Sequence, residues 1–207
     1  MNRLFGSFAL VFFLAVTVRG GQEEPVAVPP VADHFARGSL EVQNVVGTYF
    51  FFDTGRNNRP SVDFALNSTR LGIMLSNPHS SGLLAGNFEL LGEIFGGGIF
   101  QGPGNVMAGA TLLFRYNFVQ PQARVLPYLQ IGAGGVYTDI LEKESRGLIS
   151  LPVEFNLQGT VGTRIMLNDR WSVVVEGVYR HVSNAEIKKP NFGIDAAGGN
   201  VGFGFFF

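Results

Sequence analysis

Residues Pro152 to Leu167 read PVEFNLQGTVGTRIML, and apolar and polar side chains alternate along them. One parity holds Phe155, Leu157, Val161, Ile165 and Leu167, and the other holds Asn156, Gln158, Thr160 and Arg164. Successive side chains of a β-strand point to opposite faces, so this pattern predicts a strand with one apolar and one polar face. The stretch exceeds the ~5–6 residues of an ordinary strand and suits a strand of ~10 residues or more that crosses an outer membrane at a tilt.

Similar segments, bounded by turn residues, follow one another from about Gly38 to the C-terminus. We predict strands over Ser39–Phe52, Ser61–Ser76, Asn87–Phe100, Asn105–Val119, Arg124–Thr138, Pro152–Leu167, Arg170–Ser183 and Gly193–Phe207. Bacterial outer-membrane barrels close with even strand numbers, and closure satisfies every backbone polar group within the bilayer. The sequence therefore predicts an all-β fold, an eight-stranded antiparallel up-and-down transmembrane β-barrel over residues 38–207. Asn44 and Ser68 break the alternation, so we expect a bulge or a register shift in the first two strands.

The two faces of these strands indicate a barrel that is apolar outside and polar inside. Aromatic and aliphatic residues dominate one face, and the other carries charges of both signs: Glu89, Glu93, Arg115, Arg164, Glu176 and Arg180. A lipid-facing exterior and a charge-paired interior explain both sets. The last strand alternates in aromatic residues and ends on Phe207. This ending resembles the signal that the barrel assembly machinery of the outer membrane reads, so that machinery is an expected partner.

The composition agrees with a membrane protein. The chain has 207 residues, of which 28 are glycine, 20 are phenylalanine and only 15% are charged, and its mean hydropathy is +0.21. These values are too apolar and too rich in glycine for an ordinary soluble domain. The net charge of −1 gives no indication of a nucleic-acid partner, and the absence of cysteine excludes disulfides and thiol nucleophiles.

The N-terminus predicts export. A short basic start precedes the apolar run from Leu4 to Val18, which is the layout of a secretory signal peptide over residues 1–21. Residues 22–37 contain Pro25, Pro29 and Pro30, and we expect them to form an extended lead-in to the barrel.

Strand order then locates three chemically reactive residues. Both termini of such a barrel lie on the periplasmic side, so the connections Asp139–Leu151 and Asn184–Phe192 face outward. The seventh predicted strand brings His181 and Ser183 to the outer leaflet, among the alternate residues whose side chains face the lipid. Asp195 lies at the start of the next strand, and its side chain is also predicted to face the lipid. Polar groups clustered on a lipid-facing rim are costly unless they serve a function.

These residue types are those of a nucleophile, a base and an orienting acid. Ser183 Oγ would attack an ester carbonyl, His181 would act as general base and then general acid, and Asp195 would stabilise the imidazolium. The side-chain amide of Asn184 is the candidate donor for an oxyanion hole.

Other candidate sites are weaker. Lys188 and Lys189 lie in the outer loop, where they are candidates for binding phosphates of a lipid headgroup, although a solvated pair of lysines explains them equally well. The sequence contains no P-loop, dinucleotide fingerprint or cluster of metal ligands. We therefore expect no metal and no cofactor.

The stretch His181-Val182-Ser183-Asn184-Ala185, followed by Pro190-Asn191, Gly193 and an acid at 195, resembles the signature of the lipid A 3-O-deacylase (PagL-type) family. The resemblance covers about 15 residues. It implies an eight-stranded barrel of the bacterial outer membrane that binds lipopolysaccharide among the outer-membrane lipids. The implied reaction is hydrolysis of the ester-linked acyl chain at the 3-position of lipid A, without a metal.

The resemblance also implies roles for individual residues. By position, Ser183 is the nucleophile, His181 the base and Asp195 the acid, and Asn184 contributes to the oxyanion hole. The family more often has glutamate where Asp195 stands and glycine where Glu186 stands. These two departures leave room for altered substrate preference or weak activity.

Two other functions remain compatible with the residues. One is a non-enzymatic barrel with a structural or adhesive role, although the outer loops are short for adhesion. The other is a lipid A acyl transferase, which would need an apolar acyl pocket inside the barrel. A polar, charge-filled interior would leave little room for that pocket.

Overall fold

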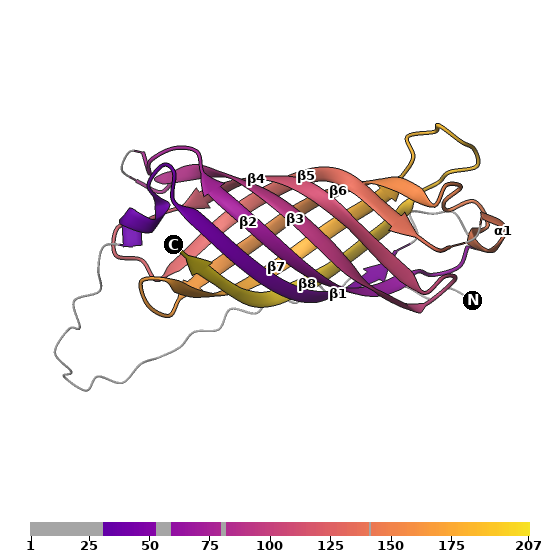
Figure 1. Cartoon of the computed structure of the whole chain (residues 1–207), viewed down its shortest axis with the longest axis horizontal. Helices are drawn as coiled ribbons and strands as arrows, with labels where there is room; N and C mark the ends of the chain where they lie inside the picture. Colours follow the sequence, from indigo (N-terminus) through magenta and orange to yellow (C-terminus); the bar gives the residue numbers. More distant parts are fainter. Residues whose placement is uncertain (1–30, 53–58, 80–81, 141) are drawn as a thin grey trace, which may run out of the picture.

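The computed structural model of the chain describes residues 31–52, 59–79, 82–140 and 142–207. Eight antiparallel strands pair in sequence order, and the last pairs with the first to close a barrel (Figure 1). They are β1 (Leu40–Phe51), β2 (Asp63–Met74), β3 (Gly86–Gln101), β4 (Val106–Phe118), β5 (Val125–Thr138), β6 (Val153–Met166), β7 (Trp171–Ser183) and β8 (Ile194–Phe206). The predicted all-β, eight-stranded up-and-down barrel is therefore confirmed, and each strand begins and ends within two residues of its prediction.

The described residues form two short helices at opposite ends of the barrel (Figure 1). The 3-10 helix η1 (Val31–Phe35) lies at the end that holds the C-terminus, which we call the terminal end. Helix α1 (Glu142–Ser145) lies in the β5–β6 connection at the other end, which we call the loop end, together with the β7–β8 connection. In the part of the chain that the structure describes, no helix is long and apolar enough to cross a membrane.

Strand alternation places apolar side chains on the outside of the barrel and polar side chains inside. On β6, the exposed side chains are Phe155, Leu157, Val161 and Ile165, and the buried ones include Asn156, Gln158 and Arg164. This distribution is the reverse of that in a soluble barrel. It suits a barrel whose outer surface meets lipid.

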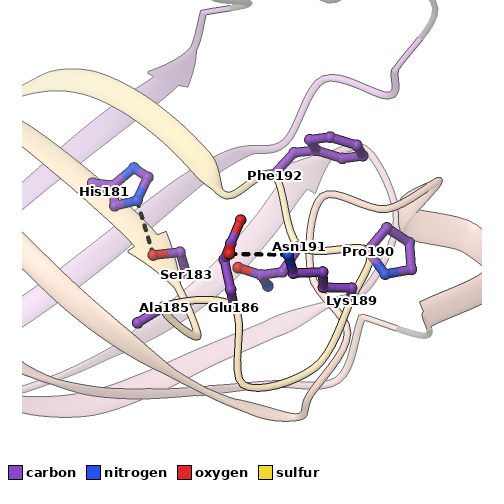
Figure 2. Close-up of a pocket in the computed structure, with 8 residues that line it drawn as sticks. All are labelled: His181, Ser183, Ala185, Glu186, Lys189, Pro190, Asn191 and Phe192. Carbon is purple, nitrogen blue, oxygen red and sulfur yellow. Dashed lines mark hydrogen bonds and ion pairs between the residues drawn. The ribbon is translucent and has the colours of Figure 1, made fainter.

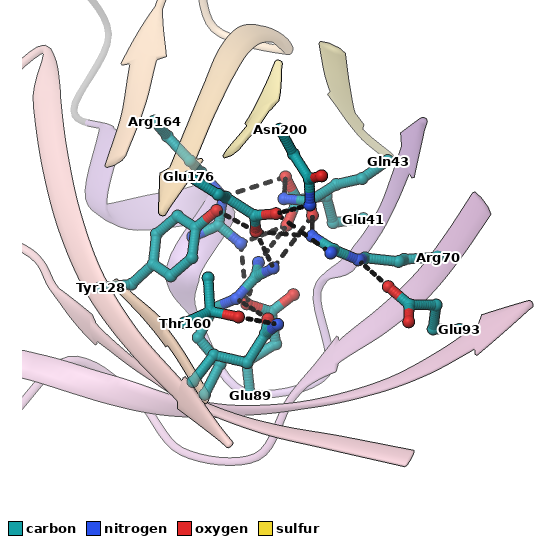
Figure 3. Close-up of polar contacts among 12 residues, drawn as sticks. Glu41, Gln43, Arg70, Glu89, Glu93, Tyr128, Thr160, Arg164, Glu176 and Asn200 are labelled. Carbon is teal, nitrogen blue, oxygen red and sulfur yellow. Dashed lines mark hydrogen bonds and ion pairs between the residues drawn. The ribbon is translucent and has the colours of Figure 1, made fainter. Parts of the chain in front are cut away.

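Paired charges fill the middle of the lumen (Figure 3). The buried arginines are Arg70, Arg115, Arg164 and Arg180, and each lies within ion-pair distance of a buried glutamate. Arg70 lies 2.7 Å from Glu93 and 2.6 Å from Glu176, and Arg164 lies 2.8 Å from Glu89. A buried charge without a partner is strongly destabilising, so these pairs must form together. The predicted charge-paired interior is confirmed for this middle layer.

Apolar clusters close the lumen on either side of the charged layer, which the sequence analysis did not predict. The terminal-end cluster contains Phe35, Met74, Val119, Leu126, Met166 and Phe206, and the loop-end cluster includes Tyr49, Phe64, Phe95, Val178, Leu148 and Ile149. Leu148 and Ile149 come from the β5–β6 connection, which folds into the mouth of the barrel. The prediction of a wholly polar interior is therefore wrong at both ends. The apolar loop-end half of the lumen is packed with side chains.

The described part of the predicted lead-in, residues 31–37, lies at the terminal end of the barrel. Residues Val31–Phe35, within the lead-in predicted over 22–37, form η1. The Phe35 ring is fully buried against Phe206, with ring centroids 5.2 Å apart, and Asn87 Nδ2 donates to the Phe35 carbonyl at 2.6 Å. The predicted signal peptide, residues 1–21, lies outside the described residues.

The two residues that break the alternation keep the regular register. The β1–β2 ladder is continuous from Leu40 to Tyr49, with Asn44 outside and Ser68 inside. Outside, Asn44 Nδ2 donates to Asn67 Oδ1 and to Thr69 Oγ1, each at 3.0 Å. The polar groups on the outer surface satisfy one another, so no bulge is needed there. A register shift does occur, but at the start of β2 against β3.

Replacing Tyr128 with phenylalanine should destabilise the charged layer. The Tyr128 hydroxyl donates to Glu176 Oε1 at 2.6 Å, and its ring lies 4.2 Å from the Arg115 guanidinium. Phenylalanine keeps the ring contact and removes the donor, so the free energy of unfolding should fall by about 1.5–3 kcal/mol, the usual cost of a hydrogen bond to a charged group. Denaturant titration of the barrel in lipid vesicles measures this loss. Tyr137→Phe, on the exposed outer face of β5, is the control, and equal stability of both variants would contradict the prediction.

Candidate active site

Three residues meet on the outer face of β7 and β8 at the loop end. His181 and Asp195 are directly opposite each other in the β7–β8 ladder, and Ser183 is two residues beyond His181 on the same face of β7. His181 Nδ1 lies 2.8 Å from Asp195 Oδ1, and His181 Nε2 lies 2.9 Å from Ser183 Oγ. The fold thus brings together all three residues that the sequence analysis singled out, on the face that parity predicted.

The direction of these hydrogen bonds follows from the acid. An ionised carboxylate only accepts, so Nδ1–H of His181 donates to Asp195 and Nε2 is left to accept the Ser183 hydroxyl proton. The side chains of His181 and Asp195 are 29% and 15% exposed, so the site is partly shielded by the barrel wall. The arrangement provides a hydroxyl whose proton has an acceptor already in place, which is the chemical requirement for an activated nucleophile.

A cavity of about 690 Å³ opens next to this hydroxyl (Figure 2). Its walls come from the end of β7 and from the β7–β8 connection: His181, Ser183, Ala185, Glu186, Lys189, Pro190, Asn191 and Phe192. The Arg59 guanidinium stacks on the Phe192 ring, 3.4 Å from its centroid. The site therefore has room for a bulky polar group beside Ser183.

The Asn184 side chain points away from the nucleophile, which corrects its predicted role. Asn184 directly follows Ser183, the last residue of β7, and its side chain is buried on the inner side. There, Asn184 Nδ2 donates to Ser150 Oγ at 2.9 Å and to the Lys188 carbonyl at 3.1 Å. These bonds use the amide donors that were predicted to face an oxyanion. The side chain instead fixes the base of the β7–β8 connection.

The two residues that follow Asn184 have an unusual backbone conformation. Ala185 and Glu186 have φ values of 51° and 65°, a left-handed conformation that costs a residue other than glycine about 1 kcal/mol or more. Neither N–H group makes a hydrogen bond to a described residue. Both residues line the cavity next to Ser183. Adjacent free N–H groups in a tight turn form a concave site for an anion.

A buried carboxylate holds this turn in place. Asn191 Oδ1 accepts from the Asn184 backbone N–H at 2.9 Å, and Asn191 Nδ2 lies 3.1 and 3.0 Å from the two oxygens of Glu154. Glu154 Oε1 also accepts from the N–H groups of Ser150 and Leu151, at 3.1 and 3.0 Å. Glu154 thereby connects β6, the β5–β6 connection and the β7–β8 connection. Nothing in the sequence pattern indicates this role, because Glu154 looks like one more inward-facing acid of a strand.

The two loop lysines have different surroundings. Lys188 Nζ lies 2.6 Å from Glu142 Oε2 and donates to the Ser150 carbonyl at 3.2 Å, so it joins the two outer connections and does not line the cavity. Lys189 does line the cavity, and its Nζ lies 3.0 Å from Glu186 Oε2 (Figure 2). Of the two lysines, only Lys189 therefore lies beside the cavity next to Ser183. Among the described residues, no group of three or more potential metal-ligating side chains is present.

Comparison with known proteins adds a family and a fold. The family model described as lipid A 3-O-deacylase (PagL) matches residues 62–204. The crystal structure of the outer membrane enzyme PagL is similar with a TM-score of 0.52 and 18% identity, over 78% of this chain and 97% of that one. The crystal structure of Neisserial surface protein A is similar with a TM-score of 0.51 and 12% identity, over 81% of this chain and 95% of that one. The N-terminal β-barrel domain of Pseudomonas aeruginosa OprF is similar with a TM-score of 0.51 and 14% identity, over 83% of this chain and 98% of that one. No curated protein matches the sequence.

Proposed function

Because this chain belongs to the lipid A 3-O-deacylase (PagL) family, we propose that it is an outer-membrane serine esterase that removes the ester-linked acyl chain from the 3-position of lipid A. The observation that carries the proposal is the continuous hydrogen-bonded series Asp195–His181–Ser183 on the outer face of the barrel, beside a cavity. A series facing the lumen would have no access to a membrane lipid.

The proposed reaction proceeds through an acyl-enzyme. Ser183 Oγ attacks the carbonyl carbon of the ester while His181 Nε2 takes the hydroxyl proton. The tetrahedral intermediate then collapses, and His181 returns the proton to the departing sugar oxygen at the 3-position. Water, deprotonated by His181, then attacks the acyl-serine. As the bond between the acyl carbon and Ser183 Oγ breaks, His181 returns the proton to Oγ and the fatty acid leaves. Throughout, Asp195 accepts from Nδ1 and stabilises the imidazolium.

We assign the oxyanion hole to the backbone N–H groups of Ala185 and Glu186. Their left-handed conformation and free donors, next to Ser183, support this assignment. The negative charge of Glu186, which would oppose an oxyanion, is paired with Lys189 at 3.0 Å in an exposed position. The side chain of Asn184 acts by fixing the turn through Ser150 and Lys188.

The lipid would approach from the outer leaflet. An apolar cavity of about 250 Å³ lies over the outer face of β5 and β6, where Gly135, Val153 and Phe155 line it with Ile187 of the β7–β8 connection. Phe155 is the cross-strand partner of Ser183, so an acyl chain in this cavity would start close to the nucleophile. On the polar side, Lys189 would contact a phosphate of the headgroup.

Export and assembly complete the proposal. The signal peptide over residues 1–21 would direct the chain out of the cytoplasm, and the terminal Phe207 would engage the barrel assembly machinery. The barrel over residues 38–207 would then reside in the bacterial outer membrane.

Mass spectrometry of lipid A tests the proposed function. The chain should be expressed in a Gram-negative host whose lipid A retains its 3-position ester. Cells with the wild-type barrel should contain lipid A that lacks this single acyl chain, and cells with Ser183→Ala should contain unaltered lipid A, because among the described residues Ser183 is the one hydroxyl hydrogen-bonded to His181. Folded barrel must be present in equal amounts in the two outer membranes. Identical lipid A in both strains would refute the proposal.

A further inference from the structure

Asp195 has a second hydrogen-bond donor besides His181. The Tyr179 hydroxyl lies 2.6 Å from Asp195 Oδ1, and the same oxygen lies 2.8 Å from His181 Nδ1. Tyr179 is two residues before His181 on the outer face of β7, so the three side chains form one row on that face. Among the described residues, these are the two side chains that donate to the Asp195 carboxylate.

The position of Asp195 makes this second donor important. An orienting carboxylate that is buried is held by surrounding donors, whereas Asp195 stands on the outer surface of the barrel, where lipid supplies none. A carboxylate with one donor can rotate about its Cβ–Cγ bond toward the water at the membrane surface. The hydroxyl of Tyr179 restrains that rotation, and as a neutral donor it leaves the charge of Asp195 available to His181.

We propose that Tyr179 is a positioning residue of the reaction, whose hydroxyl holds the Asp195 carboxylate against His181 Nδ1. This inference rests on the proposed function and adds a residue to it. The competing explanation is that Tyr179 is an aromatic residue of the membrane interface, where tyrosine is common for reasons unrelated to catalysis. Tyr179 is 43% exposed, and its ring centroid lies 6.0 Å from that of Phe52, as that explanation also expects.

A double-mutant cycle separates the two explanations. The rate of fatty-acid release from purified lipid A in detergent micelles should be measured for the wild type, Tyr179→Phe, Asp195→Ala and the double variant. Tyr179→Phe should lower kcat by about tenfold with little change in KM, as expected for the loss of one charge-assisted hydrogen bond. In the Asp195→Ala background the same substitution should change kcat by less than about twofold. Phenylalanine keeps the ring and its contact with Phe52, so the barrel should remain folded.

The matched control is Tyr137→Phe, which removes another hydroxyl from the exposed outer face, on β5, and should leave kcat unchanged. The inference is overturned if Tyr179→Phe has the wild-type kcat, or if it lowers kcat equally with and without Asp195. Failure of the proposed function would look different, since the wild type itself would then release no more fatty acid than Ser183→Ala.

Discussion

Replacing Ser183 or His181 with alanine should each lower the rate of lipid A deacylation by on the order of 10⁴-fold, and replacing both should lower it little further. The reason is that the two side chains act as one unit through the 2.9 Å contact between Ser183 Oγ and His181 Nε2. Without the base, the serine hydroxyl keeps its proton and is a poor nucleophile; without the serine, the base has no nucleophile to activate. The loss caused by Asp195→Ala should be about 10-fold to 100-fold smaller than that, because the base and the nucleophile both remain.

The measurement is kcat for fatty-acid release by each single variant and by the double variant. His79→Ala is a suitable control, since His79 lies in the β2–β3 connection and not on β7 or β8, and it should leave kcat unchanged. Losses that multiply in the double variant would contradict the prediction, because independent effects multiply whereas members of one catalytic unit do not.

The fold was predictable because every strand of a membrane barrel alternates apolar and polar residues. Each strand must present alternate residues to lipid, so the apolar parity of β6 identifies both the strand and its outer face. The same rule located the candidate site. His181 and Ser183 share the parity of the apolar positions, and adjacent strands of an up-and-down barrel bring the start of β8 beside the end of β7.

The features that were missed depend on contacts that no local rule describes. Leu148 and Ile149 lie in a connection, and only the closed barrel supplies the apolar lumen into which they fold. The left-handed turn at Ala185 and Glu186 has neither glycine nor asparagine to mark it. Asn184 is a different kind of miss, because strand parity alone would have turned its side chain inward, away from Ser183.

Replacing Gly193 with alanine should lower kcat by about 100-fold while leaving the barrel folded. Gly193 has a φ of 82°, and a Cβ atom added there would lie 2.7 Å from Cε1 and 3.3 Å from Nε2 of His181. A third neighbour, the Val182 carbonyl oxygen, would be 3.1 Å away and belongs to the backbone of β7. The backbone cannot move without breaking the ladder, so the imidazole must move instead. Its hydrogen bonds to Ser183 and Asp195 would lengthen together.

Backbone strain and contact with His181 both contribute to the effect of Gly193→Ala, and a substitution at a second glycine separates them. Alanine at positive φ costs about 1 kcal/mol in backbone strain wherever it occurs. Gly82 has a similar φ of 94° with no atom within 4 Å of an added Cβ, so Gly82→Ala carries the strain without the contact with His181. Both variants should show a similar small loss of stability, whereas only Gly193→Ala should lose activity. If the two retain equal kcat, displacement of the imidazole by a methyl group does not limit the reaction, and the triad must tolerate looser geometry than its hydrogen bonds imply.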